Sequence, residues 1–156
     1  MPRLPPQVPH RAANETQAND PKEWVNVLGD VPLFASLSPR HLRRVAGLGR
    51  IRRFHDGAVM MRKGEAGDSM YVLLDGRATV EVAKRGALHL EVGAFVGELA
   101  LLDDGPRTAT VVAAGPVVAL TIGRAAFRKL LRSEPTIALE IAAELARRLR
   151  TAQTLA

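Results

Sequence analysis

Cysteine is absent from the 156-residue chain, which excludes disulfides, thiolate metal sites and a cysteine nucleophile. Aromatic residues make up only 4% of the chain, so stacking on single-stranded bases is a poor candidate for its main activity. No apolar run approaches the roughly 18 residues that a membrane-spanning helix needs. The first ten residues also lack the apolar stretch of a signal peptide. We therefore expect a cytoplasmic protein with no membrane span.

Positive charge is what the chain has in excess. The formal net charge is +6, and 18 of the 22 basic residues are arginine. Such a balance favours an anionic partner but does not indicate a fold. Six arginines fall within fourteen residues: Arg40, Arg43, Arg44, Arg50, Arg52 and Arg53. We interpret them as a solvated face; the alternative is a docking surface for an acidic protein, a nucleic acid or an anionic lipid.

The chain divides into a short tail and one domain. Residues 1–20 contain four prolines in the first nine positions and few large apolar residues, which predicts a disordered tail. The domain should occupy residues 21–156. Its first helix is expected at Pro21, with Asp20 as the N-cap, and its second at Ser38-Pro39.

The pattern of apolar residues changes between Ile51 and Ile122. Short apolar runs alternate with glycine-rich turns, which is typical of an antiparallel barrel or sandwich, jelly rolls included. Asp75-Gly76 lies between two such runs and predicts a tight hairpin. Helical spacing returns at the end of the chain. One segment from Ala125 ends at Ser133-Glu134-Pro135, and a second helix is expected over Thr136–Arg150.

The stretch from Gly93 to Thr110 interrupts the strand pattern. Residues Gly97–Leu102 favour a helical turn, whose first N–H groups form an anion site. Arg107 follows a Gly-Pro turn, and its planar fork can hold a phosphate in two parallel bonds. Glu98 can accept a hydrogen bond from a hydroxyl. These parts suit a phosphate ester with a free hydroxyl, although Glu98 and Arg107 could instead form a surface salt bridge.

At these residues the sequence resembles a known family. The run GELALLDDGPRTAT, from Gly97 to Thr110, is similar to the phosphate-binding cassette of cyclic nucleotide-binding domains. Such domains occur in cAMP-dependent kinase regulatory subunits, in the catabolite activator protein and in cyclic-nucleotide-gated channels. The segments 64–76 and 31–34 resemble the family as well, and the likeness covers about residues 24 to 150. It implies an eight-stranded antiparallel β-roll, flanked by N-terminal helices and two C-terminal helices.

The resemblance also implies a set of ligand-binding residues: Gly97, Glu98, Leu99, Ala100, Arg107 and Thr108. Arg107 would hold the cyclic phosphate, and the N–H groups of Ala100 and Thr108 would add donors. Glu98 would accept from the ribose 2′-OH, with the Gly97 backbone close by. The implied ligand is cAMP, or else cGMP, because a hydroxyl at Thr108 accompanies cGMP preference in some kinases. No catalytic residue, metal ligand or cofactor is expected.

The resemblance suggests an output through the last helix. In the family this helix closes over the base or dimerises. Because the sequence ends at Ala156, soon after this helix, we expect a stand-alone receptor that signals through a protein partner or a homodimer. The alternatives are a cGMP-selective or degenerate module used for docking, and a basic nucleic-acid-binding β-domain that rests on charge alone. An enzyme is not expected, because the four histidines are scattered and no nucleophile elbow, Walker loop or dinucleotide fingerprint is present.

Overall fold

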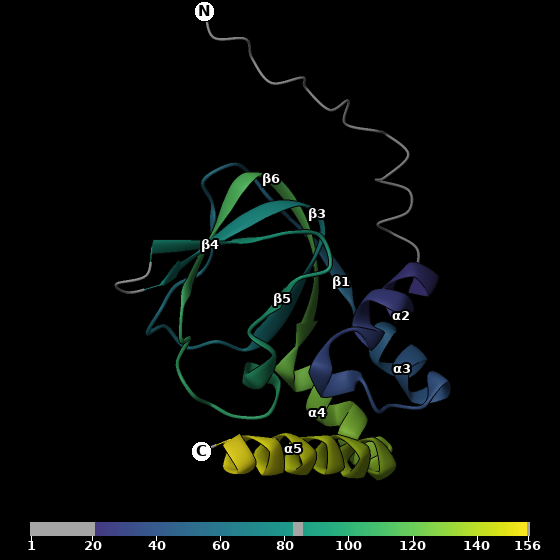
Figure 1. Ribbon diagram of the computed structural model, residues 1–156. Coiled ribbons are helices and arrows are strands. Elements are labelled where there is room, and N and C mark those ends of the chain that lie inside the picture. Colours follow the sequence, from purple (N-terminus) through teal and green to yellow (C-terminus); the bar gives the residue numbers. More distant parts are fainter. Residues whose placement is uncertain (1–20, 83–85, 156) are drawn as a thin grey trace, which may run out of the picture.

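Figure 1 presents a computed structural model of the chain, in which residues 21–82 and 86–155 are described. The predicted tail over residues 1–20, the Asp20 cap and the loop residues 83–85 lie outside these described residues. The elements, in chain order, are α2 (Pro21–Gly29), the 3-10 helix η1 (Pro32–Phe34), α3 (Pro39–Ala46), β1 (Arg50–Phe54), β2 (Val59–Met61), β3 (Ser69–Val82), β4 (Gly86–Leu90), β5 (Phe95–Val96), the 3-10 helix η2 (Glu98–Leu101), β6 (Thr110–Gly123), α4 (Arg124–Ser133) and α5 (Pro135–Leu155).

The helix signals in the sequence are confirmed where the structure describes them. The hydroxyl of Ser38 accepts a bond from the backbone N–H of His41 at 3.3 Å, and Pro39 opens α3. On α2, Trp24 and Leu28 are buried, as the apolar spacing predicts. Two C-terminal helices follow the last strand, and the second runs to Leu155, beyond the predicted end at Arg150.

The strands form an antiparallel sheet that curls into the roll seen in Figure 1. The main strand order is β1-β6-β3-β4, while β2 also pairs with β6 and β5 pairs with β3. The described residues contain six strands rather than the expected eight. The reason is that β3 and β6, of 14 residues each, both span two of the predicted runs.

The predicted hairpin at Asp75-Gly76 is wrong, because β3 continues through these residues. The register of β3 against β6 shifts between Leu73 and Asp75 and again before Arg77, which marks a bulge. Gly76 has a φ of 87°, and a Cβ added to it would collide with the carbonyl oxygen of Pro116. A glycine in the left-handed region therefore bends the strand here without reversing it.

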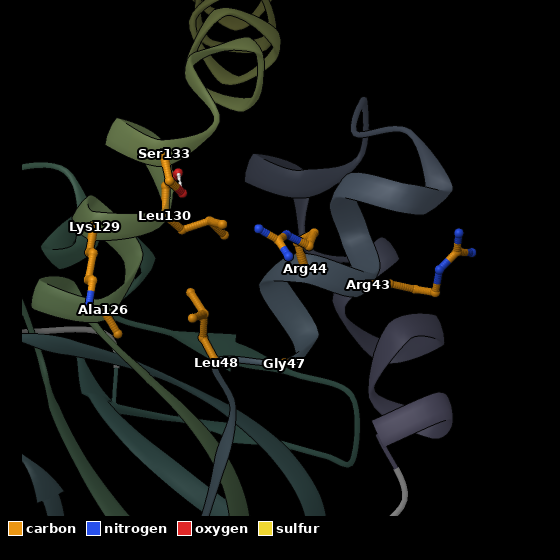
Figure 2. A pocket seen from close by; sticks show the side chains of 8 residues that line it. All are labelled: Arg43, Arg44, Gly47, Leu48, Ala126, Lys129, Leu130 and Ser133. Atoms are coloured by element: carbon orange, nitrogen blue, oxygen red, sulfur yellow. Dashed lines mark hydrogen bonds between the residues drawn. The ribbon is translucent and has the colours of Figure 1, made fainter.

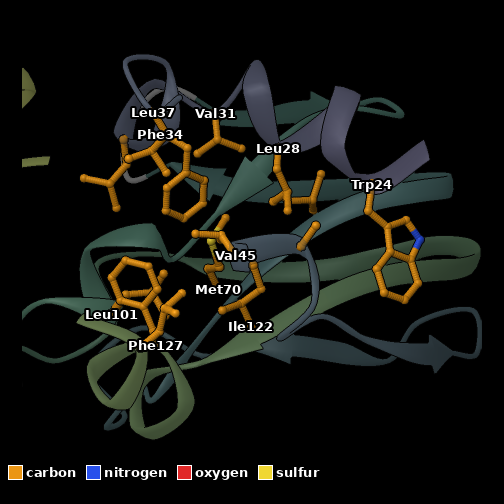
Figure 3. Packing of buried hydrophobic residues seen from close by; sticks show 14 of the residues in the cluster. Trp24, Leu28, Val31, Phe34, Leu37, Val45, Met70, Leu101, Ile122 and Phe127 are labelled. Atoms are coloured by element: carbon orange, nitrogen blue, oxygen red, sulfur yellow. The ribbon is translucent and has the colours of Figure 1, made fainter. Parts of the chain in front are cut away.

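Two apolar clusters hold the sheet and the helices together. One fills the roll around Phe54, Tyr71 and Leu73. The other packs the N-terminal helices against the sheet and α4, as Figure 3 shows. In this second cluster Phe34 and Phe127 are fully buried, and their ring centroids lie 5.8 Å apart. This cluster therefore fixes α4, which directly follows β6, against the helices α2, η1 and α3.

Helix α5 lies next to α4 at one end of the molecule (Figure 1). Its first turns are anchored by Ile137 and Ile141, which are buried. Further along, a carboxylate oxygen of Glu144 accepts from the Ser36 hydroxyl at 2.7 Å and from Arg147 at 2.8 Å. Hydrogen bonds from Arg147 and Ser36 lower the pKa of Glu144 from 4.5 to about 2. A charged Glu144 thus connects α5 to the segment that precedes α3.

Replacing Glu144→Gln should remove a stabilisation that depends on pH. Because the pKa of Glu144 is lower in the folded state, its contribution is present above the unfolded pKa of 4.5 and is lost as pH falls toward 2. The melting temperatures of wild type and Glu144→Gln should therefore differ above about pH 5 and converge near about pH 2. Circular dichroism melts across this range measure it, with the exposed Glu81→Gln as control. A difference independent of pH would contradict the ionic role.

Candidate functional site

All six residues that the resemblance implied as ligands line a single cavity. Its volume is about 270 Å³, and its lining comprises Gly97, Glu98, Leu99, Ala100, Arg107 and Thr108 together with Met61, Asp103, Gly105 and Pro106. The cavity lies between the turn that follows β5 and the loop that leads into β6. Met61, at the end of β2, also lines the cavity, and the sequence had not pointed to it.

The predicted helical turn is present as the 3-10 helix η2. Gly97 precedes it with a φ of 76°, a left-handed conformation that suits glycine. Within the turn, the N–H of Ala100 donates to the carbonyl of Gly97 at 3.1 Å. An anion approaching Ala100 would therefore share or displace this bond. Glu98 is half-buried and Leu99 is 54% exposed, so the turn presents both a carboxylate and an apolar side chain.

Arg107 is buried, with 8% of its surface exposed, and it has no carboxylate partner among the described residues. The alternative of a surface salt bridge with Glu98 is therefore wrong. Nη2 donates to the hydroxyl of Ser69 at 3.4 Å, and Nη1 is buried with no hydrogen-bond partner within residues 21–82 and 86–155. Burying an unpaired cationic donor is costly. An anion in the adjoining cavity would remove that cost.

The backbone and the neighbouring glycines fix the position of Arg107. Its backbone N–H donates to the backbone carbonyl of Glu65 at 2.8 Å, and its backbone carbonyl accepts from the N–H of Gly64 at 2.8 Å. A Cβ on Gly67 would collide with Nε of the guanidinium, and a Cβ on Gly97 would collide with Nη1. The sequence contained both glycines, but only the packing reveals that each makes room for the arginine.

The guanidinium of Arg107 lies near the Tyr71 ring, which in turn contacts Arg52. Cζ of Arg107 is 5.9 Å from the centroid of the Tyr71 ring, within the range of a cation–π contact. The Tyr71 hydroxyl accepts from Nη1 of Arg52 at 2.8 Å, and Arg52 also lies over the Phe54 ring. Arg52, from the arginine-rich run 40–53, therefore helps to hold the Tyr71 ring in place.

Arg124, which sequence analysis missed, connects the cavity to α4. Its Nη1 donates to the carbonyls of Gly67 and Asp103, each at 3.0 Å, and lies 3.5 Å from the carbonyl of Ala100. One turn further along α4, Arg128 donates to Leu102 at 3.1 Å. The local sequence around Arg124 carries no signal for this role, because every acceptor lies on another segment. The η2 turn and its following loop are thus attached to α4.

Comparison with known proteins places the chain in a family. The sequence model of the cyclic nucleotide-binding domain matches residues 51–134, which is more than half of the chain and includes the whole cavity-forming segment from Gly97 to Thr108. The chain belongs to the cyclic nucleotide-binding domain family. This family is defined by ligand binding, and its fold is the β-roll with flanking helices described above.

Two curated proteins illustrate the relationship. A cAMP-dependent protein kinase regulatory subunit from Hypocrea atroviridis is 37% identical over 108 residues, which is 69% of this chain and 23% of that protein. A cyclic nucleotide-gated potassium channel from Mesorhizobium japonicum is 40% identical over 117 residues, or 75% of this chain and 32% of the channel. The chain thus spans a third or less of the length of these relatives.

The solved structures agree with the fold. The N-terminal domain of a transcriptional regulator from Streptomyces coelicolor A3(2) superposes with a TM-score of 0.75 at 28% identity. The match covers 83% of this chain and 94% of that domain.

Within residues 21–82 and 86–155, no helix has the length and apolar character needed to cross a bilayer.

Gly67→Ala should displace the Arg107 guanidinium from its place at the cavity while preserving the fold. The three atoms nearest to the added methyl all belong to the Arg107 side chain, so the guanidinium must move and can no longer make its charge-assisted bonds to an anion placed in the cavity. Affinity for a fluorescent cyclic nucleotide should fall by at least about tenfold. Gly123→Ala is the matched control, because its Cβ would meet nothing within 4 Å. Unchanged affinity in a folded Gly67→Ala protein would refute the packing argument.

Proposed function

We propose that this chain is a cAMP receptor domain that works by binding the nucleotide and not by transforming it. The observation that carries the proposal is the buried Nη1 of Arg107, which has no hydrogen-bond partner among the residues that the structure describes and belongs to a side chain that lines the cavity. In a family whose members bind cyclic nucleotides, a cyclic phosphate is the anion that supplies the missing acceptor.

The polar groups that the sequence predicted for the site then have proposed roles. Arg107 grips the exocyclic phosphate oxygens, and the backbone N–H groups of Ala100 and Thr108 add donors. Glu98 accepts from the ribose 2′-OH, because a carboxylate oxygen accepts hydrogen bonds and the hydroxyl can donate one. Leu99, exposed at the cavity, offers apolar surface to the rest of the nucleotide.

Selectivity for cAMP is supported by the kinase regulatory subunit among the relatives, whose name specifies cAMP. The second candidate ligand is cGMP. It is favoured by one observation, namely that Thr108 is exposed and lines the cavity, where its hydroxyl could meet a guanine amino group. The two nucleotides share the phosphate and the ribose, so only cavity residues that reach the base, such as Thr108, can distinguish them.

The proposed output is a change in the position of the C-terminal helices. Arg124 and Arg128 attach the cassette to α4, and Glu144 holds α5 against Ser36. A ligand moves such helices only if it binds one of their arrangements more tightly than the other. The altered α5 then acts on a protein partner or on a second copy of the chain.

Titration calorimetry with cAMP and with cGMP tests the proposal directly. The wild-type chain should bind cAMP more tightly than cGMP. Arg107→Glu should weaken binding by at least about thirtyfold, because truncating one partner of a buried charge pair typically costs about 2–5 kcal/mol. The exposed Arg150→Glu carries the same change in charge and should bind like wild type.

The outcomes separate the parts of the proposal. Tighter binding of cGMP would transfer the assignment to the second ligand. Binding of neither nucleotide by a folded wild-type chain would overturn the receptor function. Equal binding by wild type and a folded Arg107→Glu protein would show that the phosphate is held elsewhere.

Movement of the C-terminal helices has its own test. Saturation with cAMP should raise amide-exchange protection over residues 124–150, because the bound state selects one arrangement of α4 and α5. Exchange measured by mass spectrometry with and without nucleotide resolves this segment. Protection that rises around η2 while residues 124–150 stay unchanged would refute the helix movement and leave nucleotide binding intact.

A further inference from the structure

The guanidinium of Arg107 lies in a slot between two glycines that belong to different segments. On one side is Gly67, where an added Cβ would collide with Nε, and on the other is Gly97, where an added Cβ would collide with Nη1. Gly67 belongs to the loop before β3, and Gly97 directly precedes η2. The guanidinium therefore keeps its place only while these two segments keep their separation.

One nitrogen of Arg124 joins the same two segments. On one side, Nη1 donates to the carbonyl of Gly67 at 3.0 Å. On the other side, it donates to the carbonyl of Asp103 at 3.0 Å and lies 3.5 Å from the carbonyl of Ala100. Hydrogen bonds from a charged donor are about twice as strong as those between neutral groups. Arg124 does not line the cavity, so it holds the slot together without entering the site.

The helix that carries Arg124 is itself held in the core. Phe127 of α4 packs against Phe34, with ring centroids 5.8 Å apart. The backbone N–H of Arg124 also donates to the carbonyl of Asp68 at 2.7 Å. Figure 2 shows Leu130 projecting from another face of α4 into the hollow beside α3, which Arg124 does not line. Helix α4 thus gives Arg124 the rigid base that a precisely positioned site requires.

Arg128 provides a comparison on the same helix. It donates to the carbonyl of Leu102 at 3.1 Å and lies 3.6 Å from a carboxylate oxygen of Asp104. Both partners belong to the segment that includes η2 and the loop after it. Within the described part of the chain, no hydrogen bond or ion pair joins Arg128 to the loop before β3. Of these two arginines, Arg124 alone therefore spans both sides of the slot.

We propose that Arg124 is a positioning residue for the cyclic phosphate, an assignment that rests on the proposed nucleotide function. By joining the Gly67 carbonyl to the η2 segment, it holds the Arg107 guanidinium in the binding position before the nucleotide arrives. Without these bonds the slot is free to open, and the guanidinium must be ordered when the ligand binds. That ordering lowers the affinity, because the binding free energy must then include its entropic cost.

Fluorescence anisotropy with a labelled cyclic nucleotide and the full chain tests the assignment. Arg124→Ala should weaken binding at least about tenfold, and Arg124→Lys should recover part of that loss, because an ammonium also carries several donors. Arg128→Ala should lower the affinity by no more than about threefold, since it leaves the Gly67 carbonyl bonded to Arg124. The control is Arg132→Ala, which removes the same charge from an exposed position on α4 outside the cavity and should bind like wild type.

Two further measurements separate positioning from a general loss of stability. In the nucleotide-free protein, amide exchange should become faster in residues 64–68 and 97–103 for Arg124→Ala, but only in the second segment for Arg128→Ala. The loss of affinity caused by Arg124→Ala should also be smaller in a Gly67→Ala background, because both changes act on the same guanidinium.

The outcomes distinguish this assignment from the function on which it rests. Failure of the wild-type chain to bind any cyclic nucleotide would overturn the receptor function and the positioning role together. Binding by the wild type with equal affinity in Arg124→Ala, or with an equal loss in Arg132→Ala, would overturn the positioning role alone. Full additivity of Arg124→Ala and Gly67→Ala would do the same, because it would show that the two residues act independently.

Discussion

The burial of the Arg107 guanidinium is the constraint on which the rest of the domain depends. A cation with a buried, unpartnered nitrogen is tolerated only where the surrounding structure fixes it and a ligand can complete it. Two glycines make room for its end, Tyr71 lies behind it, and the 64–66 loop pairs with its backbone. These contacts come from separate segments of the chain, so the site exists only when the roll is assembled.

The same site is attached to the helices by a second arginine. Arg124 collects carbonyls from the loop before β3, from η2 and from the loop after it. Phe127, on the same helix, packs against Phe34 in the core. The cassette is therefore joined to α4 by hydrogen bonds, and α4 is joined to the N-terminal helices by close packing.

Arginine serves three physical purposes in this chain. Arg107 offers an unpaired charge to a ligand, and Arg124 neutralises carbonyl dipoles that a turn leaves open. Arg52 covers aromatic surface with its planar group. The composition alone shows only a basic protein. Burial and neighbouring groups decide which role each arginine has, because an isolated guanidinium raises the free energy of the folded state in the interior but not in water.

Features that depend on neighbouring residues could be predicted from the sequence. The Ser38 cap, the helical turn after Gly97 and the succession of helical and strand segments follow from local chemistry, whereas the spacing from Glu98 to Arg107 was interpreted through the family resemblance. The remaining features depend on how distant segments pack. Asp75-Gly76 carries the signal of a hairpin, yet it became a bulge because the approach of Pro116 from β6 requires a bend there. The roles of Gly67, Tyr71 and Arg124, and the absence of a salt bridge at Arg107, depend on contacts between distant segments, which no local pattern encodes.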